Sequence, residues 1–331
     1  MRIPVLLLAM SLAVPLFGGV KPVPIILETD IGDDVDDMYA LVLAARSPQV
    51  DLRAVTTLYG NVALRSALAR KVLLLMHKDQ VPVASGEAMP LDGQTPRNAE
   101  WQGHGVISAA EKGSGISPLP GVELMAQVVK ASKEKVVIVS VGGLSNSAAF
   151  LQKYPGLRSK IARFVIMGGC VHPFVIAGKT YPEKWETNLH HDVKAATIVL
   201  SSGIPITLVP AEVTFKMKLY RTDFARIEQS SSPLAQIIAR ATLEFSGHIA
   251  KLLALNPAEG DSVALLHDPL AVSTLIDPTI STIEPMRIRL ETGPAHIRTL
   301  EDSKGPIKVD LVTAADAPRL SRLVVATVLQ Q

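Results

Sequence analysis

The chain has 331 residues, of which 48% are hydrophobic and 19% are charged, so it can bury a large core and is not disordered as a whole. Its 33 basic and 31 acidic residues give a formal net charge of +2, which provides no electrostatic basis for binding nucleic acid or an anionic membrane surface. A small neutral ligand fits this charge balance better.

The N-terminal segment has the layout of a secretory signal peptide. Arg2 precedes an uncharged apolar stretch over residues 3–20, and the next charge is Lys21. A membrane anchor is the alternative, because the stretch approaches a spanning length, but its prolines and glycines would weaken such a helix. We therefore predict a signal peptide over residues 1–22, export to the periplasm or the exterior, and one domain over residues 23–331.

After this segment, short β-branched runs alternate with longer helical patterns, as in the strand and helix units of a parallel sheet. Strands are predicted over residues 25–27, 52–57, 81–84, 136–141, 164–167 and 206–209. Helices are predicted over residues 36–46, 62–77 (with Asn61 as N-cap), 122–132, 146–153, 193–201, 234–255, 269–276 and 318–328. Strands of a hairpin are expected within residues 286–312, and long loops over residues 85–121 and 168–188.

Two features outside these patterns could suggest chemistry. Cys170 is the only cysteine, so no internal disulfide can form, and we predict a buried core residue because no activating partner lies nearby in the sequence. His190 and His191 are adjacent and have no cysteine partners, so we expect structural or surface roles for them and no metal pair.

The most informative segment covers residues 25–37, where an apolar strand runs into a helix through an acidic turn. Its carboxylates belong to Glu28, Asp30, Asp33, Asp34, Asp36 and Asp37. Acids in a first helical turn gain only about 0.3–1 kcal/mol each. Two like charges 4 Å apart repel by about 4 kcal/mol at an effective dielectric constant near 20, so a compact cluster needs a cation.

The residue types in the cluster indicate which cation. It contains no histidine or cysteine, so hard oxygen ligands favour Ca²⁺ or Mg²⁺ over zinc, and a crowded carboxylate site suits Ca²⁺ better. An EF-hand that started at Asp30 would have Val35 where glycine is needed and Leu41 where glutamate is needed. A purely structural calcium loop is therefore disfavoured.

Residues 29–37 (TDIGDDVDD) resemble the N-terminal signature of the inosine-uridine preferring nucleoside hydrolase family. Similar blocks follow in the family's order at residues 56–61 (TTLYGN), 142–146 (GGLSN), 167–169 (MGG) and 267–272 (HDPLAV). The resemblance implies an α/β fold, namely a doubly wound, mostly parallel open sheet with helices on both faces in a single large domain. It also implies a Ca²⁺ cofactor, hydrolysis of the bond between ribose and base in a ribonucleoside, and a homodimer or homotetramer.

The same resemblance implies roles for individual residues. Asp30 corresponds to the aspartate that binds calcium and accepts a proton from the attacking water, and His267 to a general acid or base contact near the leaving base. The other implied calcium ligands are Asp37, the backbone carbonyl of Val141, and Asp268. The implied substrate-binding residues are Asp34, Asp36, Asn61, His104, Glu186 and Asn188, with Asp34 either a ribose contact or a support for one.

The sequence departs from the family's pattern in two places, and two rival functions remain as alternatives. Glu28 stands where the family usually has aspartate, and the residues after His104 differ from the family's glycine-rich continuation, so the base preference is undefined. A phosphatase with an Asp-x-Asp nucleophile would need aspartate where Glu28 lies. The other rival is an exported nucleoside- or sugar-binding protein that keeps the calcium site without catalysis.

Overall fold

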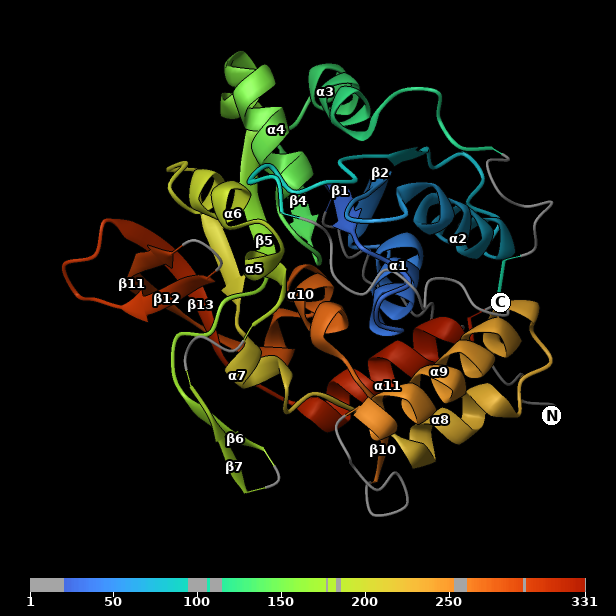
Figure 1. Ribbon diagram of the computed structural model, residues 1–331. Coiled ribbons are helices and arrows are strands. Elements are labelled where there is room, and N and C mark those ends of the chain that lie inside the picture. Colours follow the sequence, from blue (N-terminus) through green and yellow to red (C-terminus); the bar gives the residue numbers. More distant parts are fainter. Residues whose placement is uncertain are drawn as a thin grey trace, which may run out of the picture.

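The computed structural model of the protein describes residues 21–94, 106–107, 115–176, 178–182, 186–252, 261–293 and 296–330. Its centre is a nine-stranded sheet with the order β12-β11-β13-β8-β5-β4-β1-β2-β3 (Figure 1). Neighbouring strands from β3 to β13 are parallel, whereas β11 is antiparallel to both β13 and β12. The sheet is therefore mostly parallel, with an antiparallel extension at one edge.

The strands of the large sheet range from three residues in β3 to 13 in β11. Their bounds are β1 (Val23–Thr29), β2 (Val50–Thr57), β3 (Val83–Ser85), β4 (Val136–Ser140), β5 (Ile161–Met167), β8 (Ile206–Val209), β11 (Ser281–Gly293), β12 (His296–Glu301) and β13 (Ile307–Ala315). Two antiparallel pairs lie outside it, namely β6 (Phe174–Ile176) with β7 (Lys179–Tyr181), and β9 (Lys218–Tyr220) with β10 (Ser262–Leu265).

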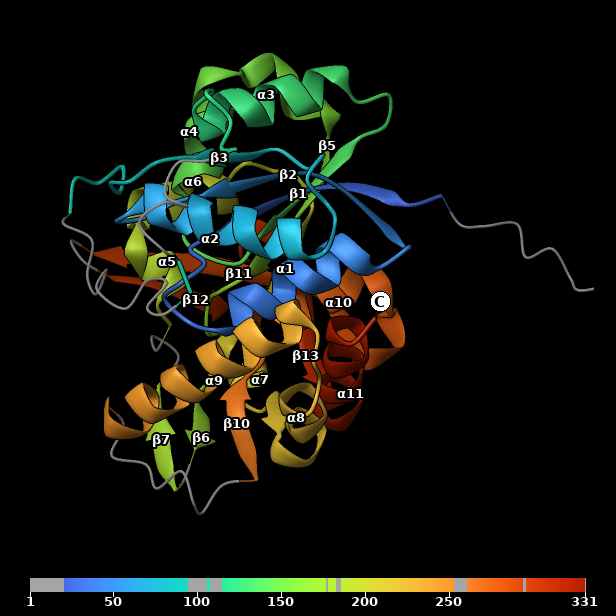
Figure 2. The same ribbon diagram turned by 90° about the vertical axis from the view of Figure 1, so that its right-hand side faces the viewer.

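Helices cover both faces of the sheet, and Figure 2 shows α3, α4 and α6 on one side and α1, α10 and α11 on the other. The helix bounds are α1 (Asp36–Arg46), α2 (Val62–Leu75), α3 (Gly121–Ala131), α4 (Ser145–Lys153), α5 (Asn188–His191), α6 (Val193–Leu200), α7 (Ala211–Thr214), α8 (Arg221–Glu228), α9 (Pro233–Leu252), α10 (His267–Ile276) and α11 (Ala317–Val328). Ile25 and Leu27 of β1 pack into one hydrophobic cluster and Ile26 into the other, so this strand is buried on both faces.

The strand order places a topological switch point between β1 and β4. The chain proceeds from β1 to β2 and β3 in one direction, and from β4 to β5 and β8 in the other. Glu28 of β1 pairs with Ser140 of β4, so the residues that follow these strands emerge side by side. Ligands of such sheets bind in the crevice beyond the carboxyl ends of the strands at this point.

The predicted fold class is confirmed, and several elements agree closely with the prediction. Helix α1 has the predicted bounds, and Asn61 caps α2 by accepting a hydrogen bond from Leu64 N at 3.2 Å. The pair β6 and β7 lies inside the segment predicted as a loop over residues 168–188, because three-residue strands are too short to show an alternating pattern. Cys170 is buried, as predicted.

Candidate functional site

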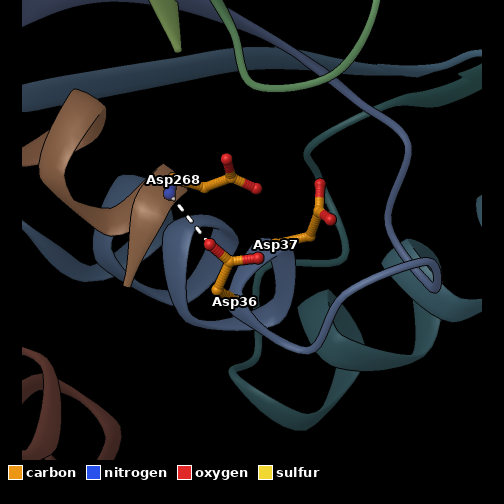
Figure 3. A group of neighbouring side chains, drawn as sticks. All are labelled: Asp36, Asp37 and Asp268. Atoms are coloured by element: carbon orange, nitrogen blue, oxygen red, sulfur yellow. Dashed lines mark hydrogen bonds between the residues drawn. The ribbon is translucent and has the colours of Figure 1, made fainter. Parts of the chain in front are cut away.

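Four aspartates gather at the switch point, and three elements supply them. Asp30 follows β1. Asp36 and Asp37 begin α1, and Asp268 lies in the first turn of α10 (Figure 3). Their relative exposures are 5%, 1%, 2% and 4% in that order. One carboxylate oxygen from each of Asp36, Asp37 and Asp268 lies within 4.8 Å of the others. Asp30 lies outside this tightest group.

Short hydrogen bonds fix the orientation of these carboxylates. The Thr29 hydroxyl donates to Asp37. The backbone N–H of Asp268 donates to Asp36 Oδ2 at 3.0 Å, which joins the start of α10 to the start of α1. Asp34 Oδ1 accepts from the backbone N–H groups of Val35 at 2.6 Å and Asp36 at 3.3 Å, so this side chain stabilises the beginning of α1.

The cluster carries more negative charge than its surroundings balance. Burial, the largest cause, and neighbouring carboxylates together raise the pKa of Asp30, Asp37 and Asp268 above the ordinary aspartate value and that of Asp36 to about 7. Within the described part of the chain, neither Asp36, Asp37 nor Asp268 forms an ion pair with a basic side chain. Two full charges at such a separation repel by about 3 kcal/mol at an effective dielectric constant of 20.

The donor set fits a hard divalent cation. The grouped side chains offer only carboxylate oxygens, and neither a thiolate nor an imidazole belongs to the group. Oxygen donors of this kind suit Ca²⁺, Mg²⁺ or Mn²⁺, whereas zinc sites usually include histidine or cysteine. Neutralising the buried charges is the role that such an ion would fill here.

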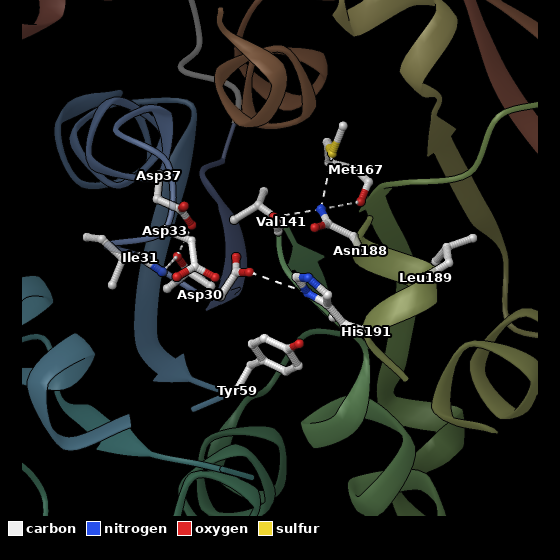
Figure 4. Close-up of polar contacts among 12 residues, drawn as sticks. Asp30, Ile31, Asp33, Asp37, Tyr59, Val141, Met167, Asn188, Leu189 and His191 are labelled. Atoms are coloured by element: carbon white, nitrogen blue, oxygen red, sulfur yellow. Dashed lines mark hydrogen bonds and ion pairs between the residues drawn. The ribbon is translucent and has the colours of Figure 1, made fainter. Parts of the chain in front are cut away.

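Asp30 faces a histidine from the other side of the crevice. Its Oδ2 lies 3.7 Å from Nδ1 of His191, whose ring stacks on Tyr59 with centroids 4.1 Å apart (Figure 4). A Cβ atom on Gly142 would lie 2.5 Å from Asp30 Oδ1, so only glycine allows the turn after β4 to approach this closely. His191, expected to be structural or on the surface, therefore lies beside the predicted catalytic aspartate.

Arg65 is the basic residue that sequence reasoning missed. It is fully buried on α2, and it donates hydrogen bonds to the backbone carbonyls of Asp30, Ile31 and Tyr59. Its Nη2 also lies 2.8 Å from Asp33 Oδ1. The guanidinium thus holds the turns after β1 and β2 in place, and its ion pair is with Asp33, although its charge also lowers the pKa of Asp30 and Asp37.

Val141, Glu186 and Asn188 meet on the β4 side of the crevice. Asn188 Nδ2 donates to the carbonyl oxygens of Val141 at 3.0 Å and Met167 at 3.1 Å (Figure 4). Glu186 accepts from the backbone N–H groups of Asn188 at 2.5 Å and Leu189 at 2.9 Å, so it caps the start of α5. Asn188 therefore links the start of α5 to the backbone carbonyl of Val141, which is predicted to be a metal ligand, although the two residues lie 47 positions apart.

His267 lies directly before Asp268 and is held by residues near α7. Its Nδ1 lies 2.7 Å from Thr214 Oγ1, and its ring meets Phe215 edge-on with centroids 4.8 Å apart. Burial lowers its pKa to about 4. The imidazole is consequently neutral at pH 7.

Three other predicted or noted residues have different surroundings. Asn61 is exposed, and its side chain accepts the helix-capping hydrogen bond described above. His104 lies outside the described residues. Glu28 is fully buried, accepts a hydrogen bond from Ser147 N at 3.0 Å, and has a pKa raised by burial to about 7. Because its backbone oxygen accepts from Val141 N at 2.9 Å, Glu28 supports the turn after β4.

The family model described as inosine-uridine preferring nucleoside hydrolase matches residues 25–322. The pyrimidine-specific ribonucleoside hydrolase RihA of Photobacterium profundum is 33% identical over 278 residues, which cover 82% of this chain and 86% of that protein.

Solved structures show the same fold. A plant nucleoside hydrolase, PpNRh1, superposes with a TM-score of 0.80 at 22% identity and covers 94% of this chain and 100% of its own. A purine-preferring ribonucleoside hydrolase from Gardnerella vaginalis superposes with a TM-score of 0.79 at 25% identity and covers 92% and 98%.

Proposed function

This chain belongs to the inosine-uridine preferring nucleoside hydrolase family and is a glycosidase that hydrolyses N-glycosyl compounds, and from that membership we propose a Ca²⁺-dependent cleavage of ribonucleosides into ribose and free base. The observation that carries the proposal is the group of Asp36, Asp37 and Asp268, which is buried at the switch point and lacks a basic partner among the described residues. A divalent ion is the simplest compensation for that charge.

The proposed ligands of the ion are Asp30, Asp37, Asp268 and the backbone carbonyl of Val141. Bound there, the ion would orient the ribose diol and lower the pKa of a water molecule. Asp36 Oδ2 accepts from Asp268 N, and Oδ1 is the proposed contact to a ribose hydroxyl. Buried oxygens all around the sugar favour the positive charge that develops on the ribosyl ring in the transition state.

Asp30 is the proposed general base. Its carboxylate is almost fully buried and directed into the crevice, and it accepts the proton of the water that attacks the anomeric carbon. The charge of Arg65 lowers the Asp30 pKa, and a bound cation would lower it further and keep Asp30 ionised, because positive charge lowers a carboxylate pKa.

His267 is the proposed contact to the leaving base. Because its pKa lies near 4, the neutral ring is the form present at pH 7, which favours a hydrogen bond to the base over transfer of a proton from an imidazolium. The proposed substrate site is completed by five further residues, namely Asp34, Glu186, Asn188, Asn61 and His104. Of these, Asp34, Glu186 and Asn188 are proposed to hold the loops that surround the ribose.

The cellular setting is proposed from sequence alone. Residues 1–22 have the layout of a signal peptide, so we propose export to the periplasm or the exterior, and by analogy with the family a homodimer or homotetramer. Among the described residues, no helix is both long and apolar enough to cross a membrane.

The test is release of reducing sugar from a panel of uridine, cytidine, inosine and adenosine by the mature chain, before and after chelation. We expect release with Ca²⁺, loss of release after chelation, and recovery when Ca²⁺ is returned. Pyrimidine nucleosides are the proposed preference, because the relative that is 33% identical is named pyrimidine-specific. Tight nucleoside binding without sugar release in the presence of Ca²⁺ would instead establish the binding-protein alternative.

A further inference from the structure

Helix α7 approaches the predicted base-binding end of the crevice without contributing a residue to the acidic cluster. It follows β8 and contacts α10, so it lies at the same edge of the sheet as the predicted site (Figure 1). Thr214 is its last residue and is fully buried. A buried hydroxyl must direct its hydrogen to an acceptor, because an unsatisfied one costs about 1–3 kcal/mol.

Two acceptors lie within reach of the Thr214 hydroxyl. His267 Nδ1 lies at 2.7 Å, and the backbone carbonyl of Ala211 at 3.4 Å, near the limit for a hydrogen bond. Bonds donated by a hydroxyl are usually shorter than bonds donated by N–H, whose distances cluster near 2.9–3.0 Å. Both comparisons favour the hydroxyl as donor and Nδ1 as acceptor.

We propose that Thr214 is a positioning residue for His267, whose hydroxyl donates to Nδ1 and thereby fixes the tautomer that carries its proton on Nε2. The hydrogen bond made by one ring nitrogen decides which form the other adopts. Phe215 limits rotation of the ring through its edge-on contact, with an interplanar angle of 83°. In that tautomer, the ring of His267 carries an Nε2–H group that can donate a hydrogen bond to a ligand.

This inference rests on the proposed function, because it assigns a purpose to that N–H group. As the bond between ribose and base breaks, the electron pair passes to the base, and a hydrogen bond from Nε2–H stabilises the charge that develops there. The acceptor is a ring nitrogen or exocyclic oxygen of the base. Without the Thr214 hydroxyl, part of the population would present a bare Nε2 lone pair, which repels such an acceptor.

The first test reads the tautomer directly by ¹⁵N NMR of histidine-labelled protein, with the His267 signals assigned from His267→Gln. We expect the Nε2–H form in the wild type and in Thr214→Ser, and a mixture in Thr214→Val. Thr327→Val is the matched control, because Thr327 is a buried helical threonine on α11 that donates to Leu323 O at 2.8 Å. A proton on Nδ1 in the wild type, or an unchanged tautomer in Thr214→Val, would overturn the proposal.

The second test separates leaving-group assistance from a general structural defect. For Thr214→Val we expect kcat on uridine to fall about 10-fold or more with little change in KM, by analogy with other residues that orient a functional histidine. Activity on 4-nitrophenyl riboside should stay within about twofold, because that leaving group needs little assistance. Equal losses on both substrates would show a structural role and refute the inference.

Failure of the proposed function would look different from failure of this inference. If the wild type released sugar from no nucleoside, the proposed reaction would be wrong, while the NMR signals would still report whether Thr214 fixes the His267 tautomer. A normal thermal unfolding curve for Thr214→Ser and Thr327→Val completes the controls.

Discussion

Two regions of the molecule bring carboxylates close together, but the negative charge is balanced differently in each. On β11 and β12, Glu291 lies 2.7 Å from Arg298 and 3.7 Å from Arg289, and Arg289 also lies 3.8 Å from Asp302. These side chains are partly solvent-exposed, with 43% of the Glu291 side chain accessible. At the switch point, the grouped carboxylates are almost fully buried, and no basic residue in the described part of the chain pairs with them.

The difference shows where a charge is structural and where it is functional. Water screens the exposed ion pairs, so each pair contributes only about 0–1 kcal/mol to the free energy of unfolding. Water cannot screen the buried group, so its charges require either protons or a cation. The chain supplies Arg65 nearby but directs it to Asp33 and backbone carbonyls, which leaves room in the cluster for an ion from solution.

The largest expected effect comes from Asp30→Asn, which keeps the shape of the crevice but removes the proposed general base. Turnover should fall by about 10³-fold or more, within or above the usual range for such a group. Initial rates of sugar release measure it, with the exposed acid variant Glu291→Gln as control. Activity near the wild-type level in Asp30→Asn would show that the crevice is not the catalytic centre.

The next largest effect is expected for Arg65→Met, measured by urea unfolding with Ca²⁺ present. Removal of the guanidinium deletes the ion pair with Asp33 and leaves three backbone carbonyls without this donor, so the free energy of unfolding should fall by about 3–5 kcal/mol. Arg298→Met, on the exposed strand pair, should cost less than about 1 kcal/mol. Equal costs at the two sites would abolish the distinction between the regions.

A smaller effect is expected from pH in protein stripped of metal. The pKa of Asp36 is about 7 in the folded state and near 3.8 in the unfolded state, so the folded state binds its proton more tightly. Stability is therefore greatest below about pH 4 for this group and falls as pH rises through about 7. The melting temperature of desalted, metal-free protein should be lower at pH 8 than at pH 5, and added Ca²⁺ should raise it at pH 8. Identical melting temperatures for the metal-free protein would contradict the charge argument.

The smallest effect is expected for Glu291→Gln, which removes an exposed charge shared by two arginines. Its free energy of unfolding should change by less than about 0.5 kcal/mol, and its Ca²⁺ requirement should stay that of the wild type. Calorimetric melting provides the measurement. A loss of several kcal/mol here would mean that exposure does not separate the two regions.

Sequence alone predicted those features that lie close together along the chain. The run from Asp30 to Asp37 spans one strand end and one helix start, so its clustering follows from local geometry, and the cap at Asn61 has a residue type that marks helix starts. Asp268 was placed by resemblance to the family rather than by spacing.

Contacts between distant segments could not be predicted from such patterns. Arg65 reaches Asp30 across 35 positions, and Thr214 reaches His267 across 53. His191 reaches Asp30 only because the turn after β4 contains glycine where the two segments meet. Hydrophobic periodicity orients a side chain inward or outward, but the partner it meets depends on the order of strands in the sheet.

The most direct test of the central claim is titration of metal-free protein with Ca²⁺ by isothermal calorimetry near pH 7.5. The account predicts tight binding of about one ion per chain at the buried group, an affinity at least about 10-fold weaker in Asp37→Asn, and no change in Glu291→Gln. Absence of Ca²⁺ binding to the wild type, with no rise in melting temperature on adding the ion, would contradict it.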